Sequence, residues 1–187
     1  AEQRYSLIFT YADNKSKNDF SFGSTKISNN TKKINLIHKL NELYLFEIIG
    51  NKNKKYSWSE NFDDKNYNLD EYNLNPKFTY LMVDNNRINF IYKISNIKNS
   101  LGQEESLKQQ NFGLSLYLNQ KEKKGFISEF NYYKNDFDGG ANSLISYVMM
   151  NGLQNGENYT WSFRVQRKLS KLLDINFIYL GRKSKTS

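Results

Sequence analysis

Hydrophobic and polar residues alternate with a period of two along much of this chain, and residues 159–168 show the pattern most clearly. Because successive side chains of a strand point to opposite faces, this stretch predicts a β-strand with one apolar and one polar face. The apolar positions are Tyr159, Trp161, Phe163 and Val165, and the polar positions are Thr160, Ser162, Arg164, Gln166 and Lys168. Such a strand lies between water and an apolar phase, which is either a protein core or a lipid bilayer.

The same alternation predicts strands in the first half of the chain. Residues 4–12 and 20–28 form one pair, with the polar residues between them as the turn. Residues 33–50 fit a helical spacing and also two strands that meet near Asn41, and their β-branched and aromatic second half favours the strands. Residues 51–76 are polar and irregular, so we expect a long loop at the rim of the sheet.

Three clearer hairpins follow. They pair residues 78–82 with 88–94, residues 112–120 with 125–133, and residues 159–168 with 173–180. The first turns at Asp84, Asn85 and Asn86, where asparagine tolerates a positive φ. The second turns at the polar residues 121–124.

The C-terminal third also contains a last predicted strand and a candidate short helix. In the last strand the apolar positions are Leu173, Ile175, Phe177 and Tyr179, and Asn176 lies on the polar face. Residues 142–151 predict a short helix that begins near Ser143 and ends at Gly152, or else an extended loop. The whole chain therefore predicts an all-β fold, an antiparallel meander of about ten strands of nine or ten residues, longer than the usual five or six.

This alternation fits an outer-membrane β-barrel and also a soluble β-sandwich or open sheet. A barrel strand needs about nine to eleven residues, an apolar outer face, a polar inner face and aromatic residues at both interfaces. Tyrosines at predicted strand ends favour the barrel, as at Tyr5, Tyr11, Tyr159 and Tyr179. The lumen-facing positions would be Arg164, Gln166, Lys168 and Asn176. Isoleucines on the nominally polar face, at Ile8, Ile37, Ile91 and Ile178, imply a packed lumen or a sheet covered on both sides.

Composition narrows the class of protein. The 187 residues contain one proline and no Gly/Ser-rich linker, so we expect a single domain over residues 1–187. There is no cysteine, which excludes disulfide scaffolds and cysteine zinc sites. No apolar run reaches the roughly 18 residues of a membrane-spanning helix. The net charge of +8 permits acidic partners, but lysines interleaved with acidic residues in turns favour solvated turns.

No arrangement of residues predicts catalysis or a cofactor. His38 is the only histidine, which excludes histidine-based triads and multi-histidine metal sites. Carboxylates cluster at residues 60–71 and 136–138, but neither spacing matches a calcium loop, and a solvated loop is favoured. Basic and aromatic residues interleave in residues 159–168 as they do in single-strand nucleic-acid sites, yet a strand with one dry face explains them as well. We therefore expect no enzyme, metal, cofactor or nucleic-acid partner.

Residues 78–187 resemble the C-terminal region of large, mostly uncharacterised outer-membrane or cell-surface proteins of Bacteroidota, especially flavobacteria. The strings "NFGLSLYLNQKEKKGFISEFNYYKNDFDGGANS", "GLQNGENYTW" and "QRKLSKLLDINFIYLGRKS" carry the resemblance. Its specific positions are Asn111, Phe112, Gly113, Asn131, Gly152, Leu153, Gly156, Asn158, Trp161, Gln166, Leu169, Gly181, Arg182, Lys183 and Ser184. In those proteins a further strand follows the turn that corresponds to residues 181–184, so we expect either an outer-membrane β-barrel or the C-terminal part of a larger one. The resemblance implies a β-rich outer-membrane segment and carries over no catalytic residue.

Two functional hypotheses follow. The first is a non-enzymatic component of an outer-membrane β-barrel with a structural, channel or assembly role, in contact with membrane lipid or lipopolysaccharide and with other envelope proteins. The second is a soluble β-sheet module at the cell surface or in the periplasm. That module would bind a glycan or a protein through exposed aromatics such as Trp58 and Tyr67.

Overall fold

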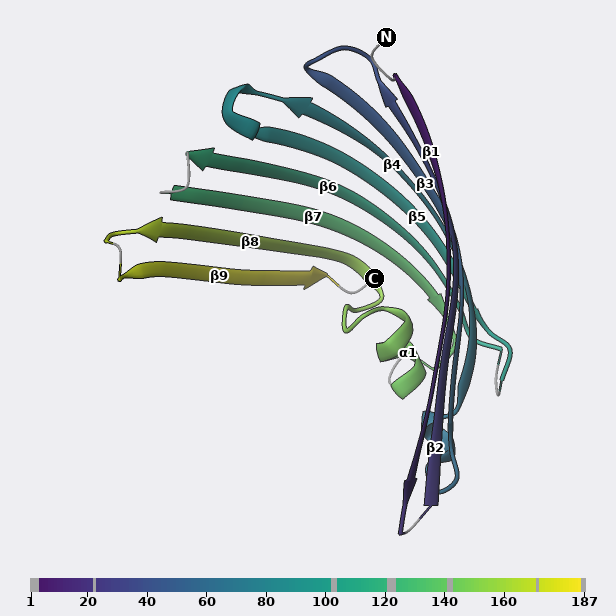
Figure 1. The fold of residues 1–187 in the computed structure, drawn as a ribbon. Helices are drawn as coiled ribbons and strands as arrows, with labels where there is room; N and C mark the ends of the chain where they lie inside the picture. Colours follow the sequence, from purple (N-terminus) through teal and green to yellow (C-terminus); the bar gives the residue numbers. More distant parts are fainter. Residues whose placement is uncertain are drawn as a thin grey trace.

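The computed structural model describes residues 4–21, 23–101, 104–120, 124–140, 143–170 and 172–185. Nine strands form one antiparallel sheet in which each strand pairs with its neighbours in sequence (Figure 1). They are β1 (Tyr5–Phe20), β2 (Gly23–Lys39), β3 (Tyr44–Ser59), β4 (Tyr67–Leu81), β5 (Arg87–Asn99), β6 (Ser106–Gln120), β7 (Lys124–Asp138), β8 (Gly156–Lys168) and β9 (Asp174–Lys185). The expected all-β antiparallel meander is confirmed.

The sheet is strongly curved and open. Strands β1 and β9 lie at its two ends and do not pair with each other in the described part of the chain (Figure 1). The helix α1 (Leu144–Met149), in the connection from β7 to β8, lies on the concave side (Figure 1). Of the forms that the sequence allowed, the described residues adopt the open sheet.

The strands are longer than the sequence pattern indicates, and two expected loops are wrong. Residues 13–19 are not a turn but the second half of β1, and residues 51–76 contain the end of β3, a short 3₁₀ turn at Asp63–Lys65 and most of β4. In these segments polar residues face both sides of the sheet, as where Asn14 pairs with Asn29. In residues 13–19 and 51–55 the backbone ladder continues without an apolar face, so no alternation marks it in the sequence. In β4 the apolar side chains change face between Leu69 and Tyr72, which interrupts the period of two.

Two of the turns have the chemistry that their residues predict. Asp84 and Asn85 adopt φ angles of 60° and 61° between β4 and β5. Between β2 and β3, the Asn41 side chain accepts hydrogen bonds from the backbone N–H groups of Leu43 and Tyr44, which confirms two strands in residues 33–50. Of the expected turn at 121–124, residues 121–123 lie outside the described residues.

The expected short helix is confirmed. The Ser143 side chain accepts a hydrogen bond from the backbone N–H of Ser146, as a helix N-cap does. At the other end Gly152 has a φ of 75°, which favours glycine and ends the helical segment.

Residues 181–184 do not form the turn that the resemblance implies, because they continue β9. Gly181 lies opposite Trp161 of β8, and a Cβ at this position would overlap the indole ring. An aromatic ring over a cross-strand glycine covers backbone that the glycine leaves bare. Glycine is therefore required here by close packing within a strand rather than by a turn.

The buried core is small and lies under α1. Its members are Leu69, Ile97, Leu107, Phe137, Met149 and Met150. The four strand residues come from β4 to β7 and point to the concave face, where Met149 and Met150 pack on them. Most other large apolar side chains of the sheet lie on the opposite, convex face.

Candidate functional site

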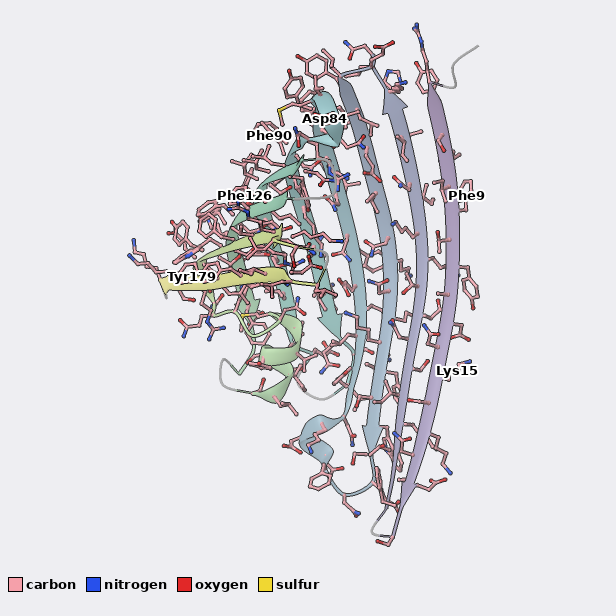
Figure 2. The ribbon with its side chains drawn as sticks, turned by 60° about the vertical axis from the view of Figure 1, so that its left-hand side comes forward. Phe9, Lys15, Asp84, Phe90, Phe126 and Tyr179 are labelled. Carbon is pink, nitrogen blue, oxygen red and sulfur yellow. The ribbon has the colours of Figure 1, made fainter. Side chains whose placement is uncertain are left out.

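The convex face carries a continuous belt of mainly apolar side chains across all nine strands, which we name the apolar band. Its members, which point away from the face that α1 covers, are Tyr5, Leu7, Phe9 and Tyr11 of β1; Ile34, Leu36 and His38 of β2; Tyr44, Phe46, Ile48 and Gly50 of β3; Tyr72, Leu74, Pro76, Phe78 and Tyr80 of β4; Ile88, Phe90, Tyr92 and Ile94 of β5; Phe112, Leu114, Leu116 and Leu118 of β6; Phe126, Ser128, Phe130 and Tyr132 of β7; Tyr159, Trp161, Phe163 and Val165 of β8; and Ile175, Phe177 and Tyr179 of β9. Figure 2 shows Phe9 projecting from β1 on the side away from α1.

Burial in this sheet is inverted relative to a soluble protein. Phe9 is 69% exposed and Phe177 is 58% exposed on the convex face, whereas Asn89 and Ser115 on the concave face are each only 5% exposed. Soluble sheets bury their apolar face and present the polar one to water. An uncovered apolar surface of this extent marks an interaction with another protein or a membrane.

Tyrosines mark the edges of the apolar band rather than the ends of the strands. At the edge nearer α1 they are Tyr11, Tyr72, Tyr132, Tyr159 and Tyr179, and at the opposite edge they are Tyr5, Tyr44 and Tyr80. The ring centroids of Tyr132 and Tyr159 are 5.2 Å apart, and those of Tyr44 and Tyr80 are 5.3 Å apart. The expectation that Tyr11 and Tyr179 end their strands is wrong, because β1 continues to Phe20 and β9 to Lys185.

The apolar band crosses the sheet obliquely. The row of paired residues that starts at Phe9 stays free of polar side chains as far as Ile94 on β5, and then becomes polar through Gln110, Lys134, Glu157 and Lys185. On β9 the band is centred on Phe177, about seven residues from the level of its centre on β1. At about 3.3 Å per residue and 4.8 Å per strand, this is about 23 Å over 38 Å, an inclination of about 30°.

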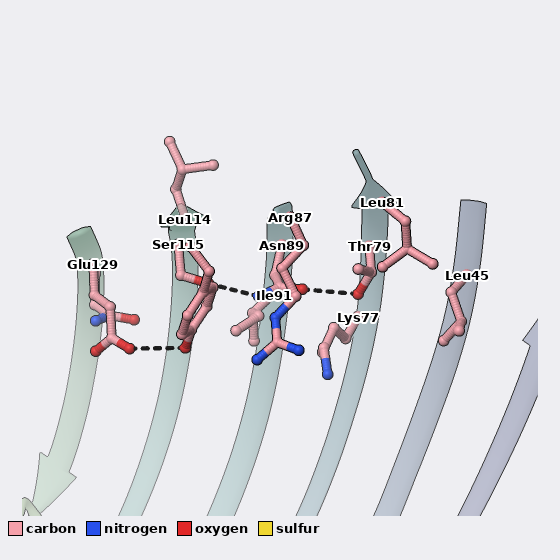
Figure 3. Close-up of a pocket in the computed structure, with 12 residues that line it drawn as sticks. Leu45, Lys77, Thr79, Leu81, Arg87, Asn89, Ile91, Leu114, Ser115 and Glu129 are labelled. Carbon is pink, nitrogen blue, oxygen red and sulfur yellow. Dashed lines mark hydrogen bonds between the residues drawn. The ribbon is translucent and has the colours of Figure 1, made fainter. Parts of the chain in front are cut away.

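Directly behind the apolar band, the concave face is lined by hydrogen-bonded polar side chains (Figure 3). The Thr79 hydroxyl donates to Asn89 Oδ1 at 2.8 Å, and Asn89 Nδ2 donates to the Ser115 hydroxyl at 2.9 Å, which joins β4, β5 and β6. These residues border a hollow of about 360 Å³. The Arg87 guanidinium lies 4.4 Å from the centre of the Tyr117 ring, as in a cation–π contact.

Two acidic side chains of the concave face are held by partners on neighbouring strands. The Tyr117 hydroxyl donates to Glu129 at 3.0 Å, at the edge of the hollow (Figure 3). Glu47 accepts a hydrogen bond from Asn35 at 2.7 Å and forms an ion pair with Lys77 at 2.9 Å. These two carboxylates are therefore matched across the strands, whereas buried side-chain oxygens of Asn35, Ser95 and Asn111 on the same face have no hydrogen-bond partner among the described residues.

Beyond the tyrosines at the edge nearer α1, which we name the tyrosine edge, Glu71 is the centre of a further polar cluster on the concave face. It accepts hydrogen bonds from Asn53 and Asn73 at 3.2 and 2.8 Å and forms a 2.9 Å ion pair with Lys55. Burial acts to raise the pKa of this carboxyl, but the hydrogen bonds and the lysine charge together hold it below its usual value. Glu71 is 8% exposed within β4, so the interpretation of its acidic segment as a solvated loop is wrong for this residue.

The residues that the sequence assigns to two faces do lie on two faces. Phe163 pairs with Tyr179 and Val165 with Phe177, which places both apolar sets on the convex side with Tyr159, Trp161 and Ile175. Leu173 precedes β9, and its carbonyl accepts a hydrogen bond from the Leu169 N–H in the turn. The polar set lies on the opposite face: Arg164, Gln166, Lys168 and Asn176.

Other kinds of site find little support in the described residues. In that part of the chain no group of three or more His, Cys, Asp or Glu side chains could hold a metal ion. His38 lies on the convex face, stacked on Tyr5 with the ring centroids 4.3 Å apart. None of the described helices is long and apolar enough to cross a membrane. No protein-family model, curated protein or solved structure matches this chain.

Proposed function

We propose that this sheet forms part of the wall of an outer-membrane β-barrel of a Gram-negative bacterium, with the apolar band against lipid and the concave polar face toward the interior. The observation that carries the proposal is the inverted burial: the apolar side chains are on the uncovered convex face and the polar ones on the concave face. A barrel wall requires this arrangement, because lipid surrounds it and its interior is polar. The role is structural, in transport or in assembly, and not enzymatic.

The dimensions of the apolar band support the proposal. On β4 the band runs from Tyr72 to Tyr80, eight residue steps that span about 27 Å along the strand. With the strand tilted by about 30°, this corresponds to a thickness of about 23 Å, close to the apolar belt of about 25 Å on outer-membrane barrels. The tilt itself is close to the roughly 35–45° of closed barrels.

The connections between strands favour one orientation. At the edge away from α1, β2 and β3 are joined by residues 40–43, and β4 and β5 by residues 82–86. At the α1 side the strands extend well beyond the apolar band, and residues 139–155 join β7 to β8. Outer-membrane barrels have short periplasmic turns and longer extracellular loops. The α1 side would therefore face the outside of the cell.

In the alternative hypothesis, a soluble module binds its ligand through Trp58 and Tyr67. Both side chains already contact other residues of this chain. The Lys26 ammonium lies 5.1 Å from the centre of the Trp58 ring, and Tyr67 packs against the core cluster under α1. A soluble module would also need a cover for the apolar band. The same experiment separates the two hypotheses.

Two single-tryptophan variants provide that experiment, because the chain has only two tryptophans. Trp58→Phe leaves Trp161 in the apolar band, and Trp161→Phe leaves Trp58 on the same convex face beyond the tyrosine edge. After reconstitution into vesicles of brominated phosphatidylcholine, we expect strong quenching of Trp161 and weak quenching of Trp58. A protein that is monomeric in water without detergent, with both tryptophans equally insensitive to the vesicles, would overturn the membrane assignment.

A further inference from the structure

The apolar band has a gap on β3 at Gly50. Gly50 is paired with Ile34 of β2 and Leu74 of β4, and a Cβ added at this position would meet no atom within 4 Å. The gap is part of a groove of about 550 Å³ on the convex face. The side chains that border this groove are Phe9, Tyr11, Ile34, Lys32, Lys52 and Tyr72. Its floor is thus apolar, and its end toward the α1 side is cationic and aromatic.

The cationic end consists of two lysines on neighbouring strands, Lys32 of β2 and Lys52 of β3. Lys32 and Lys52 are direct cross-strand partners on one face, an arrangement that destabilises a sheet when both carry the same charge. The Lys52 ammonium lies 4.6 Å from the centre of the Tyr72 ring. The nearby Asp70 is paired with Lys54 at 3.5 Å. Neither Lys32 nor Lys52 forms an ion pair in the described part of the chain, and an anion placed between them would be attracted by both charges.

We infer that this groove binds a phosphate-bearing lipid. One acyl chain would lie over Gly50 against Phe9 and Ile34, and the phosphate would lie between the ammonium groups of Lys32 and Lys52. This inference rests on the proposed function, because it places the groove at the depth where the tyrosine edge meets lipid headgroups. Free phosphate would use only the lysines, whereas the apolar floor fits a ligand that also carries a hydrocarbon chain.

The test uses the full 187-residue chain in detergent, with lipid binding measured by native mass spectrometry. The probes are phosphatidylglycerol, a diacylglycerol without phosphate, and inorganic phosphate. We expect phosphatidylglycerol to bind most tightly. The double variant Lys32→Gln and Lys52→Gln should weaken its binding about 25-fold, at about fivefold for each lysine that faces a lipid phosphate.

Two further variants separate the groove from general charge effects. Gly50→Leu places a side chain in the gap, where its Cβ would meet no atom within 4 Å. It should weaken the binding of phosphatidylglycerol about tenfold, since about two fewer methylene groups of the lipid would be buried. The matched control is Lys15→Gln with Lys17→Gln, which removes two lysines that pair with acidic residues farther out on the same face. This control should leave binding unchanged.

The outcomes that overturn the inference are distinct. Equal losses in the two double variants would show nonspecific attraction, and inorganic phosphate that competes fully while Gly50→Leu has no effect would show an anion site without lipid. Either result would leave the membrane assignment standing, because the tryptophan quenching measures insertion separately. A chain that fails to insert would refute the proposed function, whatever the result in detergent.

Discussion

A charge placed in the apolar band provides the sharpest test of which phase the convex face contacts. Phe90 of β5 lies near the middle of the band and is 53% exposed. Asn96 lies on the same strand and the same face, six residues further on and outside the band. Phe90→Arg and Asn96→Arg therefore introduce the same cation at two depths of one strand.

The expected difference follows from the geometry of β5. Six residues span about 20 Å along the strand, or about 17 Å across the membrane at a tilt of about 30°. An arginine on the lipid face costs about 2–4 kcal/mol at the midplane and about 0–1 kcal/mol near the interface. Phe90→Arg should therefore lower the folding equilibrium constant by a factor of roughly 30 to 700, and Asn96→Arg by less than about tenfold.

The assay is reversible urea unfolding in phospholipid vesicles, followed by tryptophan fluorescence. The two variants and the wild-type chain are compared at the same lipid composition and pH, so that only the depth of the arginine differs. Far-UV circular dichroism before the titration shows whether each variant has folded to the same strand content.

A water-exposed convex face gives the opposite result. Phe90 would then be an exposed side chain whose replacement by arginine costs little, since surface substitutions change stability by about 0.5 kcal/mol or less. The variant would also be more soluble without detergent. Equal stabilities of Phe90→Arg and Asn96→Arg would refute the assignment of the convex face to lipid.

Three other substitutions test separate features of the sheet. Gly181→Ala should lower the free energy of unfolding in urea by about 1–3 kcal/mol, since its Cβ would displace the Trp161 ring. The control Gly125→Ala, whose Cβ would have its nearest neighbour at 3.9 Å, should leave that free energy unchanged. Equal losses in the two variants would contradict this reasoning. Met149→Ala should destabilise the α1 contact by about 2–5 kcal/mol and speed hydrogen exchange of the helix amides, and unchanged exchange would refute that contact. Glu71→Gln should lower the unfolding free energy by about 1–3 kcal/mol at pH 7. Because the folded pKa of Glu71 is depressed, wild type should lose the same increment as the pH falls below the ordinary value of 4.5, and parallel pH profiles would contradict this.

The sequence predicts strands where one face stays apolar over several residues, and it fails where neither face is apolar or, as between Leu69 and Tyr72 of β4, where the apolar side chains change face. The alternation in residues 159–168 identifies both faces of β8, because the side chains of this segment differ in chemistry from one position to the next. Beyond the tyrosine edge the pattern disappears although pairing continues, as between Lys54 and Asp70. Backbone pairing and polar cross-strand contacts such as Lys55 with Glu71 hold those segments, and neither produces a period of two in hydrophobicity.

Curvature and register were also beyond the reach of the sequence pattern. Alternation shows that two faces differ, but it does not show which one is concave. In the sequence, the isoleucines of the polar face imply a packed lumen or a second covering layer. In the structure Ile8 and Ile178 are 46% and 47% exposed, so neither side chain is covered. The groove over Gly50 depends on which residues lie opposite one another on β2 and β4, and that information appears only with the register.

The two faces of the sheet differ in how strictly they determine the register of the strands. If β4 slipped by two residues along β5, Phe78 would meet Ile88 or Tyr92 in place of its present partner, and the convex face would stay apolar. The same slip would separate Thr79 from Asn89 and leave buried polar groups without partners, at a cost of about 1–3 kcal/mol for each. The apolar band therefore tolerates slips by two residues. The cross-strand polar pairs of the concave face, such as Thr79 with Asn89 and Asn89 with Ser115, form only in the present register and therefore select it among those slips.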